Sequence, residues 1–262
     1  MTAAGPVPPT GFASGAAATA HVVRPGGLPD AVHLGGDDGH HLQRVRRIRV
    51  GEAVTVADGA GRWRRYDVAE VGRGTLELVA AGAEHLEPAL TPALTVACAV
   101  GKGTKPDAVV ADLTELGVDR IVFFRSARSV VRWDGPREAA AAERFAKVAR
   151  EAAGQCRRAR LPEIVVGVAV GDLPGFGTVV VGSPGGVAPV DLGGPGPLGW
   201  CAVVGAEGGL APDEEAVLAA SPGAGAVAVG PHVLRTETAA VAVAAALVGR
   251  RRPAGSGPSG SG

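Results

Sequence analysis

The chain has 262 residues, of which 46% are hydrophobic, and its 26 basic side chains balance 26 acidic ones. This length and composition suit a soluble globular protein of one large or two modest domains. No uninterrupted apolar stretch reaches the roughly 18–20 residues that span a bilayer, and the first 20 residues lack a basic start followed by an apolar core. We therefore expect a cytoplasmic protein with no membrane partner.

The first part of the chain is expected to form a small domain of strands. Residues 1–19 are rich in Ala, Gly and Pro without periodicity, which predicts a flexible segment. Short strand-like runs then follow, separated by turn signals such as Asp58-Gly59. The predicted strands are 31–34, 53–58, 62–71 and 75–81. They indicate a barrel-like β-domain over residues 20–84, and the proline-containing stretch 85–93 is the predicted linker.

From residue 94 onward, strand-like and helix-like runs alternate. The predicted strands are 94–100, 120–124, 163–168, 178–182, 200–204 and 226–229, and the predicted helices are 106–116, 136–158, one that begins at 212, and 235–247. Such alternation is typical of an α/β domain with a mostly parallel sheet. We place this domain over residues 94–250 and predict a flexible tail over residues 251–262.

The three cysteines, Cys98, Cys156 and Cys201, are far apart and have no paired metal or redox spacing. Cys98 and Cys201 lie within apolar runs, so we expect both to be small buried hydrophobic residues. No metal site is expected.

Positive charge is concentrated in two places. Residues 41–65 contain seven arginines against two carboxylates, and residues 150–160 contain four more arginines. Clustered arginines are expected of a protein that binds nucleic acid, because contacts to phosphates supply most of the sequence-independent affinity. Basic surfaces that bind nothing are also common, so the clusters alone leave both interpretations open.

Two short stretches near the end each join a strand-like run to a helix-like run: VVGAEGGL at 203–210 and VLRTETAA at 233–240. In an open α/β sheet, small ligands bind beyond the carboxyl ends of the strands, where glycines let the backbone approach them. Either loop alone is equally consistent with an ordinary turn. Four polar residues, 235–238, occupy the first turn of an otherwise apolar helix, and this favours a ligand site.

Six pieces of the chain, in order, resemble a known family. They are HHLQRVRRIRVGEAVTVADGAG at 40–61, LTELGVDRI at 113–121, ARSVVRW at 127–133, AREAAGQCRRARLPEI at 149–164, VVGAEGG at 203–209 and VGPHVLRTETA at 229–239. The family is that of the bacterial 16S ribosomal RNA uracil-N3 methyltransferases, RsmE-like members of the SPOUT class. The resemblance extends from about residue 21 to 247. It implies a PUA-like RNA-binding domain followed by a SPOUT domain with a deep trefoil knot, and a homodimer.

The resemblance also implies the reaction, a methyl transfer from S-adenosylmethionine to N3 of one uridine in 16S rRNA of the small ribosomal subunit. We expect Arg235 to hold the uracil carbonyls or a phosphate, and Glu237 or Glu207 to accept the N3 proton. The expected cofactor-binding residues are Val204, Gly205, Glu207, Gly208, Gly209, Val229, Gly230, Leu234 and Thr236. The expected RNA contacts are Arg44, Arg47, Arg49, Arg65 and Arg158.

Several alternatives remain open at this stage. Arg235 and Glu237 are also compatible with a structural ion pair, and Thr236 with a helix cap. A ribose 2′-O-methyltransferase of the same class is a rival, although LRTETAA stands where that group usually has a serine-asparagine motif. An inactive RNA-binding module is another, because Ala206 replaces the family's usual proline. His232 likewise replaces a more usual arginine.

Overall fold

The computed structural model describes residues 18–99, 105–129 and 135–254, and the chain divides into two compact units. The first unit comprises Met1–Pro88 together with Ala153–Leu161, and the second comprises Ala89–Ala152 together with Pro162–Gly262. Within the described ranges, no helix is both long enough and apolar enough to cross a membrane.

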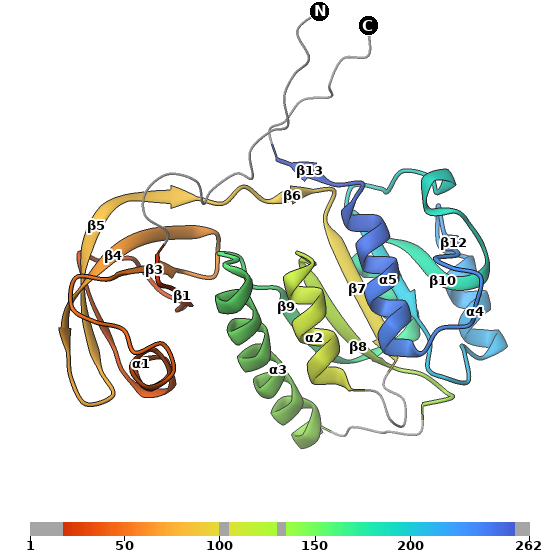
Figure 1. Cartoon of the computed structure of the whole chain (residues 1–262). Coiled ribbons are helices and arrows are strands. Elements are labelled where there is room, and N and C mark those ends of the chain that lie inside the picture. The colour runs from red at the N-terminus through yellow and green to blue at the C-terminus, as the bar shows by residue number, and fades with distance from the viewer. Residues whose placement is uncertain (1–17, 100–104, 130–134, 255–262) are drawn as a thin grey trace, which may run out of the picture. The chain divides into compact units, whose positions relative to one another are not determined.

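The first unit is built on a curled five-stranded sheet (Figure 1). Its strand order is β1 (Ala20–Val23), β3 (Ala53–Ala57), β4 (Arg62–Val71), β5 (Leu76–Leu86) and β2 (Ala31–Leu34). β1 pairs with β3 in parallel, and the other pairs are antiparallel. The core on one side of the sheet contains fully buried Tyr66, Leu76 and Leu78. In the described part β1 and β2 do not pair, so the expected barrel is an open, curled sheet.

A helix that the sequence pattern did not predict lies in this unit. α1 (Gly36–Arg44) buries only Gly39 and Leu42, so its pattern carries little apolar periodicity. Gly39 packs directly on the turn before β5, where an added Cβ would lie 2.4 Å from the carbonyl oxygen of Gly74. Glycine is therefore required at a position that helix propensity disfavours.

Ala153–Leu161 belongs with the first unit, whereas we had expected it in the domain of residues 94–250. Ala153 and Ala159 pack against Val23 and Ala57 of the β-sheet unit. The backbone of this segment also bonds the turn before β4, through Gly61 N–H to the Ala159 carbonyl at 3.1 Å. The first unit is thus assembled from two separate parts of the chain.

The second unit contains a six-stranded sheet in which every pair is parallel. The order is β12 (Gly225–Val227), β10 (Thr178–Val187), β11 (Trp200–Val204), β7 (Leu94–Ala99), β8 (Arg120–Arg125) and β9 (Glu163–Ala169). β7 and β11 lie at the centre and are buried at every residue, as expected of strands covered on both faces. The expected α/β class with a mostly parallel sheet is confirmed.

Helices cover both faces of this sheet. α2 (Pro106–Glu115), α3 (Gly135–Cys156) and α5 (Thr236–Val248) share one apolar core with the near face in Figure 1. The short helix η1 (Val170–Phe176) and α4 (Pro212–Ala219) contribute to the core on the other face. Cys98 belongs to the first core and Cys201 to the second. Burial raises the pKa of both thiols to about 12, so both are inert apolar fillers, as predicted.

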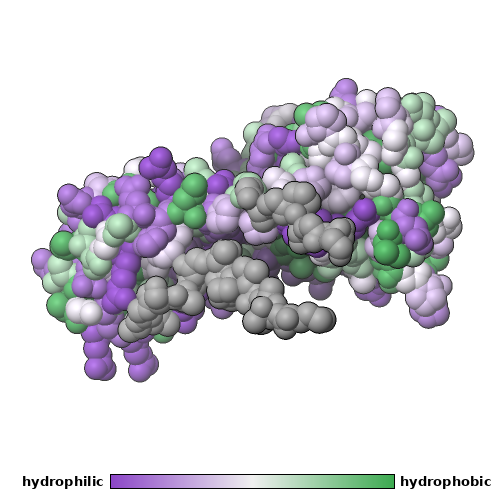
Figure 2. Space-filling model, turned by 90° about the horizontal axis from the view of Figure 1, so that it is seen from above, coloured by the Kyte–Doolittle hydropathy of each residue, from purple (hydrophilic) through white to green (hydrophobic). Residues whose placement is uncertain are grey.

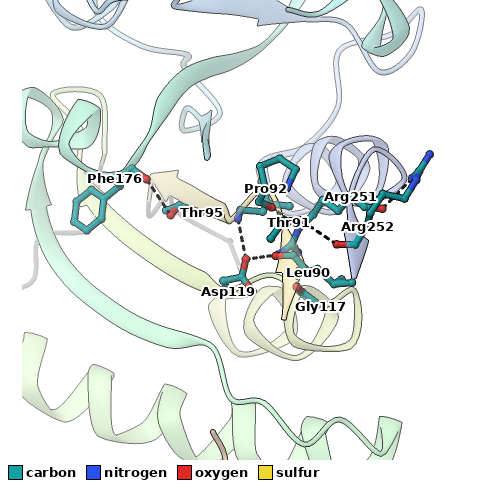
Figure 3. A network of polar contacts seen from close by, with 10 residues as sticks. Leu90, Thr91, Pro92, Thr95, Gly117, Asp119, Phe176, Arg251 and Arg252 are labelled. Carbon is teal, nitrogen blue, oxygen red and sulfur yellow. Dashed lines mark hydrogen bonds and ion pairs between the residues drawn. The ribbon is translucent and has the colours of Figure 1, made fainter. Parts of the chain in front are cut away.

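The ends of the second unit are tied together where we expected a linker and a flexible tail. β6 (Leu90–Thr91) pairs with β13 (Arg252–Pro253), and the side chain of Arg251 is fully buried between them. Its guanidinium donates hydrogen bonds to three carbonyl oxygens and to the Asp119 carboxylate (Figure 3); the carbonyls are those of Leu90, Pro92 and Gly117. Residues 251–254 are therefore part of the fold, and the prediction of a flexible tail is wrong for them.

Candidate active site

The two stretches 203–210 and 233–240 line one pocket of about 400 Å³. The pocket lies at the carboxyl ends of β11 and β12 and beside the middle of β10, and ligands commonly bind at the carboxyl ends of the strands of a parallel sheet. The nine residues expected to bind a cofactor all line it: Val204, Gly205, Glu207, Gly208, Gly209, Val229, Gly230, Leu234 and Thr236. The fold thus brings together residues that are up to 32 positions apart in the sequence.

The sequence pattern did not reveal a third wall of this pocket. Residues 181–184, in the middle of β10, line the pocket together with Glu215, Ala239 and Val243. The only sequence signal for residues 181–184 is the Gly-Ser-Pro that ends a strand-like run. Their role depends on which strands become neighbours, and periodicity along the chain does not specify that.

The glycine loop (residues 205–210) is a tight turn whose shape requires glycine. Gly209 has φ +72°, in the left-handed region, and its N–H bonds the carbonyl of Ala206 at 2.8 Å. A Cβ on Gly205 would lie 3.1 Å from the backbone carbon of Gly209. Ala206, where the family's usual proline is missing, is buried in the core and still closes this turn.

The first turn of α5 is joined to the glycine loop by Thr236. Its hydroxyl is buried and donates to the Gly205 carbonyl at 3.0 Å. The N-cap of the helix is Arg235, and no side chain caps it. The interpretation of Thr236 as a helix cap is therefore wrong, because its hydroxyl bonds the opposite loop.

The three candidate catalytic residues differ in position. Glu207 lines the pocket and its side chain is exposed. Arg235 is exposed and Glu237 half-buried beside the pocket wall, but neither is among the residues that line it. Both residues are described, and no ion pair joins them, so the structural ion-pair alternative is not observed.

The seven arginines of residues 41–65 separate into two groups. Arg44, Arg46, Arg47 and Arg49, at the end of α1 and in the following loop, are exposed, and no ion pair involves any of them in the described chain. Arg62, Arg64 and Arg65 of β4 each face a carboxylate: Glu84, Asp30 and Asp67. On the face seen in Figure 2, hydrophilic side chains cover much of this unit. Within residues 41–65, the arginines that face no carboxylate are therefore those around the end of α1, while Arg158, elsewhere in the unit, is half-buried.

A histidine of the first unit is held neutral by its surroundings. His21 is buried, and its Nε2 lies 3.2 Å from the Arg158 carbonyl oxygen. Burial is the main cause that lowers its pKa to about 4, and the charge of Arg157 lowers it further, while the bond to the carbonyl opposes the shift. His21 is thus a structural residue at physiological pH.

Comparisons with known proteins agree with this architecture. The RNA methyltransferase domain family matches residues 89–248, and the RNA methyltransferase PUA domain family matches residues 34–80. Ribosomal RNA small subunit methyltransferase E of Mycobacterium tuberculosis is 39% identical over 236 residues, which cover 85% of this chain and 88% of the relative. This chain belongs to the ribosomal RNA small subunit methyltransferase E family.

Solved structures of low sequence identity share the fold. A methyltransferase from Legionella pneumophila, in complex with S-adenosylmethionine, superposes with a TM-score of 0.78 at 22% identity, over 88% of this chain and 97% of that one. The family member from Neisseria gonorrhoeae, also bound to S-adenosylmethionine, gives 0.75 at 24% identity, over 87% and 95%. In the part of the present chain that the structure describes, no group of three or more histidine, cysteine, aspartate or glutamate side chains is placed to hold a metal ion.

Proposed function

We propose that this chain transfers a methyl group from S-adenosylmethionine to N3 of one uridine in 16S rRNA of the small ribosomal subunit. The observation that supports this most is that all nine residues expected to bind the cofactor line one pocket, in a chain that belongs to this methyltransferase family. A ribosomal substrate supports a location in the cytoplasm. The resemblance further supports a homodimer and a knotted second unit, a topology that physical priors alone would not suggest.

The pocket fits S-adenosylmethionine in size and in chemistry. A volume of about 400 Å³ lies within the range of small-molecule sites. The glycine loop offers backbone groups that no Cβ shields, and Val229, Leu234 and Val243 offer apolar contacts for an adenine ring. Bound there, S-adenosylmethionine would supply an electrophilic methyl group.

The chain's own residues must prepare the acceptor. N3 of uracil carries a proton, so it is a poor nucleophile until that proton leaves and negative charge spreads onto the two neighbouring carbonyl oxygens. The Arg235 guanidinium can stabilise this charge, and the Glu237 or Glu207 carboxylate can accept the proton. Because Arg235 and Glu237 lie beside the pocket and not in its wall, we assign them to the nucleotide.

The RNA must present an unpaired base, because N3 lies on the Watson–Crick edge. The exposed arginines Arg44, Arg47 and Arg49 are suited to phosphate contacts, which orient an RNA without reading its sequence. Arg65 and Arg158 are weaker candidates, since Arg65 faces Asp67 at 3.8 Å and Arg158 is half-buried.

The test is an assay with labelled S-adenosylmethionine and small subunits that lack the modification, followed by digestion of the RNA and identification of the nucleoside. We expect labelled 3-methyluridine, and no label with subunits that are already modified. A ribose-methylated nucleoside would instead support the 2′-O-methyltransferase alternative. An absence of S-adenosylmethionine binding in calorimetry would support the inactive-module alternative.

A further inference from the structure

A segment that does not line the pocket is hydrogen-bonded to the glycine loop and to the residues that follow it. This segment, residues 126–128, follows β8 and forms the turn that we call the clasp. It lies about 80–90 positions from the residues that it bonds. Its contacts reach both the middle of the glycine loop and the residue that follows it.

The first contact is a buried carboxylate. Glu214, on the first turn of α4, is 8% exposed, and its two oxygens accept three hydrogen bonds. The Ser126 hydroxyl donates to Oε2 at 3.0 Å, and the Ala127 N–H donates to Oε1 at 2.7 Å. The N–H of Ala211, directly after the glycine loop, donates to Oε2 at 2.8 Å. Glu214 thus joins the clasp to the end of the loop.

The second contact comes from the clasp itself. Arg128 Nη1 donates to the carbonyl oxygen of Gly208 at 2.6 Å, a short bond from a charged donor. The aliphatic part of the same side chain covers Gly208, because a Cβ built there would meet Arg128 Cδ at 3.5 Å. Together with Thr236 on Gly205, the loop is therefore held at its beginning, middle and end.

We propose that Glu214 and Arg128 are positioning residues that set the shape of the glycine loop, and hence the affinity of the pocket for S-adenosylmethionine. This inference rests on the proposed function for the identity of the ligand. Neither residue lines the pocket, so both act through the backbone of residues 208–211. A glycine turn has few side-chain contacts of its own, so its unbound conformation is weakly fixed. Hydrogen bonds from outside the turn reduce the conformational entropy that is lost when a ligand binds.

A helix cap alone does not account for Glu214. The bond from the Ala211 N–H is the reciprocal half of a capping box, which needs only one carboxylate oxygen. The other two bonds come from the clasp, 87 and 88 positions away, and do nothing for α4. Ser126→Ala therefore separates the two roles, because it weakens the clasp and leaves the cap intact.

The experiment measures S-adenosylmethionine binding by calorimetry for Glu214→Gln, Ser126→Ala, Arg128→Ala and the double variant Glu214→Gln/Arg128→Ala. In Glu214→Gln, an NH2 group replaces one of the two acceptor oxygens. It therefore faces at least one N–H or O–H donor of the clasp or the loop and cannot accept its hydrogen bond. We expect about tenfold weaker binding for Glu214→Gln, roughly fivefold for Arg128→Ala, and a smaller loss for Ser126→Ala. The double variant should bind about as weakly as Glu214→Gln alone, since both changes release one loop.

The matched control is Asp213→Asn, which removes an exposed carboxylate from the same helical turn and should bind within about twofold of wild type. Arg128→Lys keeps a donor near Gly208 and should bind better than Arg128→Ala. At saturating S-adenosylmethionine, turnover of Arg128→Ala should remain near wild type, so that its defect is confined to KM. Wild-type affinity in both Glu214→Gln and Arg128→Ala, or additive losses in the double variant, would overturn the proposal.

Hydrogen exchange of the ligand-free protein tests the same hold without any cofactor. We expect the amides of residues 205–211 to exchange faster in Glu214→Gln and in Arg128→Ala, with the amides of β11 unchanged. Unchanged exchange of the loop would contradict the inference. If the wild type did not bind S-adenosylmethionine, the proposed function would fail, and the exchange result would still decide the role of the clasp.

Discussion

The guanidinium of Arg251 and the carboxylate of Asp119, 132 positions apart, form an ion pair in which the arginine side chain has no exposed surface. Asp119 also accepts the Leu94 N–H at 2.8 Å, so one carboxylate joins the start of β7 to the chain that leaves α5. Burial lowers the pKa of Arg251, and the charge of Asp119 opposes that shift. α5 begins at Thr236, beside the pocket, and ends at Val248, close to Arg251. The ion pair therefore lies at the other end of α5 from the pocket.

Arg251→Met should destabilise the second unit by about 3 kcal/mol, because it removes the charge partner of the Asp119 carboxylate and the donor that Arg251 supplies to three carbonyl oxygens. Urea unfolding followed by fluorescence measures this loss. The neighbouring Arg252→Met is the control, and we expect a change below about 1 kcal/mol there, because Arg252 is exposed. Equal effects of the two variants would mean that the buried pair contributes little.

Acid should destabilise the first unit through His21. Its pKa is 6.5 in an unfolded chain and about 4 when folded, so between these values the unfolded state binds the proton first. The free energy of unfolding should therefore fall as pH drops from about 6.5 to 4, by about 3 kcal/mol in total for this group, and be unaffected above that window. In His21→Gln, the free energy of unfolding should not show this part of its decrease between about pH 6.5 and 4. His232→Gln, at an exposed histidine, should retain it.

Thr236→Val tests the link between α5 and the glycine loop. The change keeps the side-chain shape and removes the hydroxyl, which leaves the Gly205 carbonyl without its donor. We expect S-adenosylmethionine affinity to fall about fivefold and the unfolding free energy by about 1 kcal/mol. Thr238→Val, two residues on and exposed, should behave as wild type in both measurements. A loss of the same size in Thr238→Val would show that helix propensity, not the link, is responsible.

Arg235→Ala and Glu237→Gln should lower turnover without weakening cofactor binding. Neither residue lines the pocket, and both are assigned to the uracil, so we expect kcat to fall about 100-fold while the Kd for S-adenosylmethionine stays within about threefold. Methylation kinetics and calorimetry on the same preparations give the two numbers. Glu115→Gln, at an exposed position on α2, is the control. If both variants turn over near the wild-type rate, the chemistry does not reside at this helix start.

The unpaired arginines of the first unit should contribute to RNA affinity through counterion release. Arg44→Gln and Arg49→Gln should each weaken RNA binding uniformly across sequences and lower the slope of log K against log salt by about 1. Arg62→Gln is the matched control, because Arg62 already faces Glu84 at 3.2 Å, and we expect a smaller change. Filter binding at several salt concentrations measures the slopes. Equal slopes in all three variants would contradict this assignment.

Much of the second unit was predictable because its signals are local. Strand runs such as 120–124 and 200–204 and the helices from Pro106 and Pro212 lie within a few residues of their predicted limits. The first unit was less predictable. α1 has almost no apolar face, so hydrophobic periodicity did not predict it. The sequence pattern assigns the start of Ala153–Leu161 to the end of a long helix of the second unit, whereas this segment packs against the first unit.

The candidate site divides in the same way. Its glycine loop could be recognised from the sequence, because the left-handed backbone conformation at residue 209 requires a glycine. Residues 181–184, Glu214 and Arg128 could not. Each acts through a contact with a segment distant in the sequence, and no period or motif along the chain marks such a contact.

The sequence alone thus determined the class of the second unit, the position of the two loops and the family, since propensity, alternation and motif order are properties of neighbouring residues. The tertiary structure decided that Thr236 bonds the opposite loop, that Arg251 is buried, and which arginines are free of carboxylates. These outcomes depend on which strands lie side by side, and folding selects that arrangement by burying apolar surface across the whole chain.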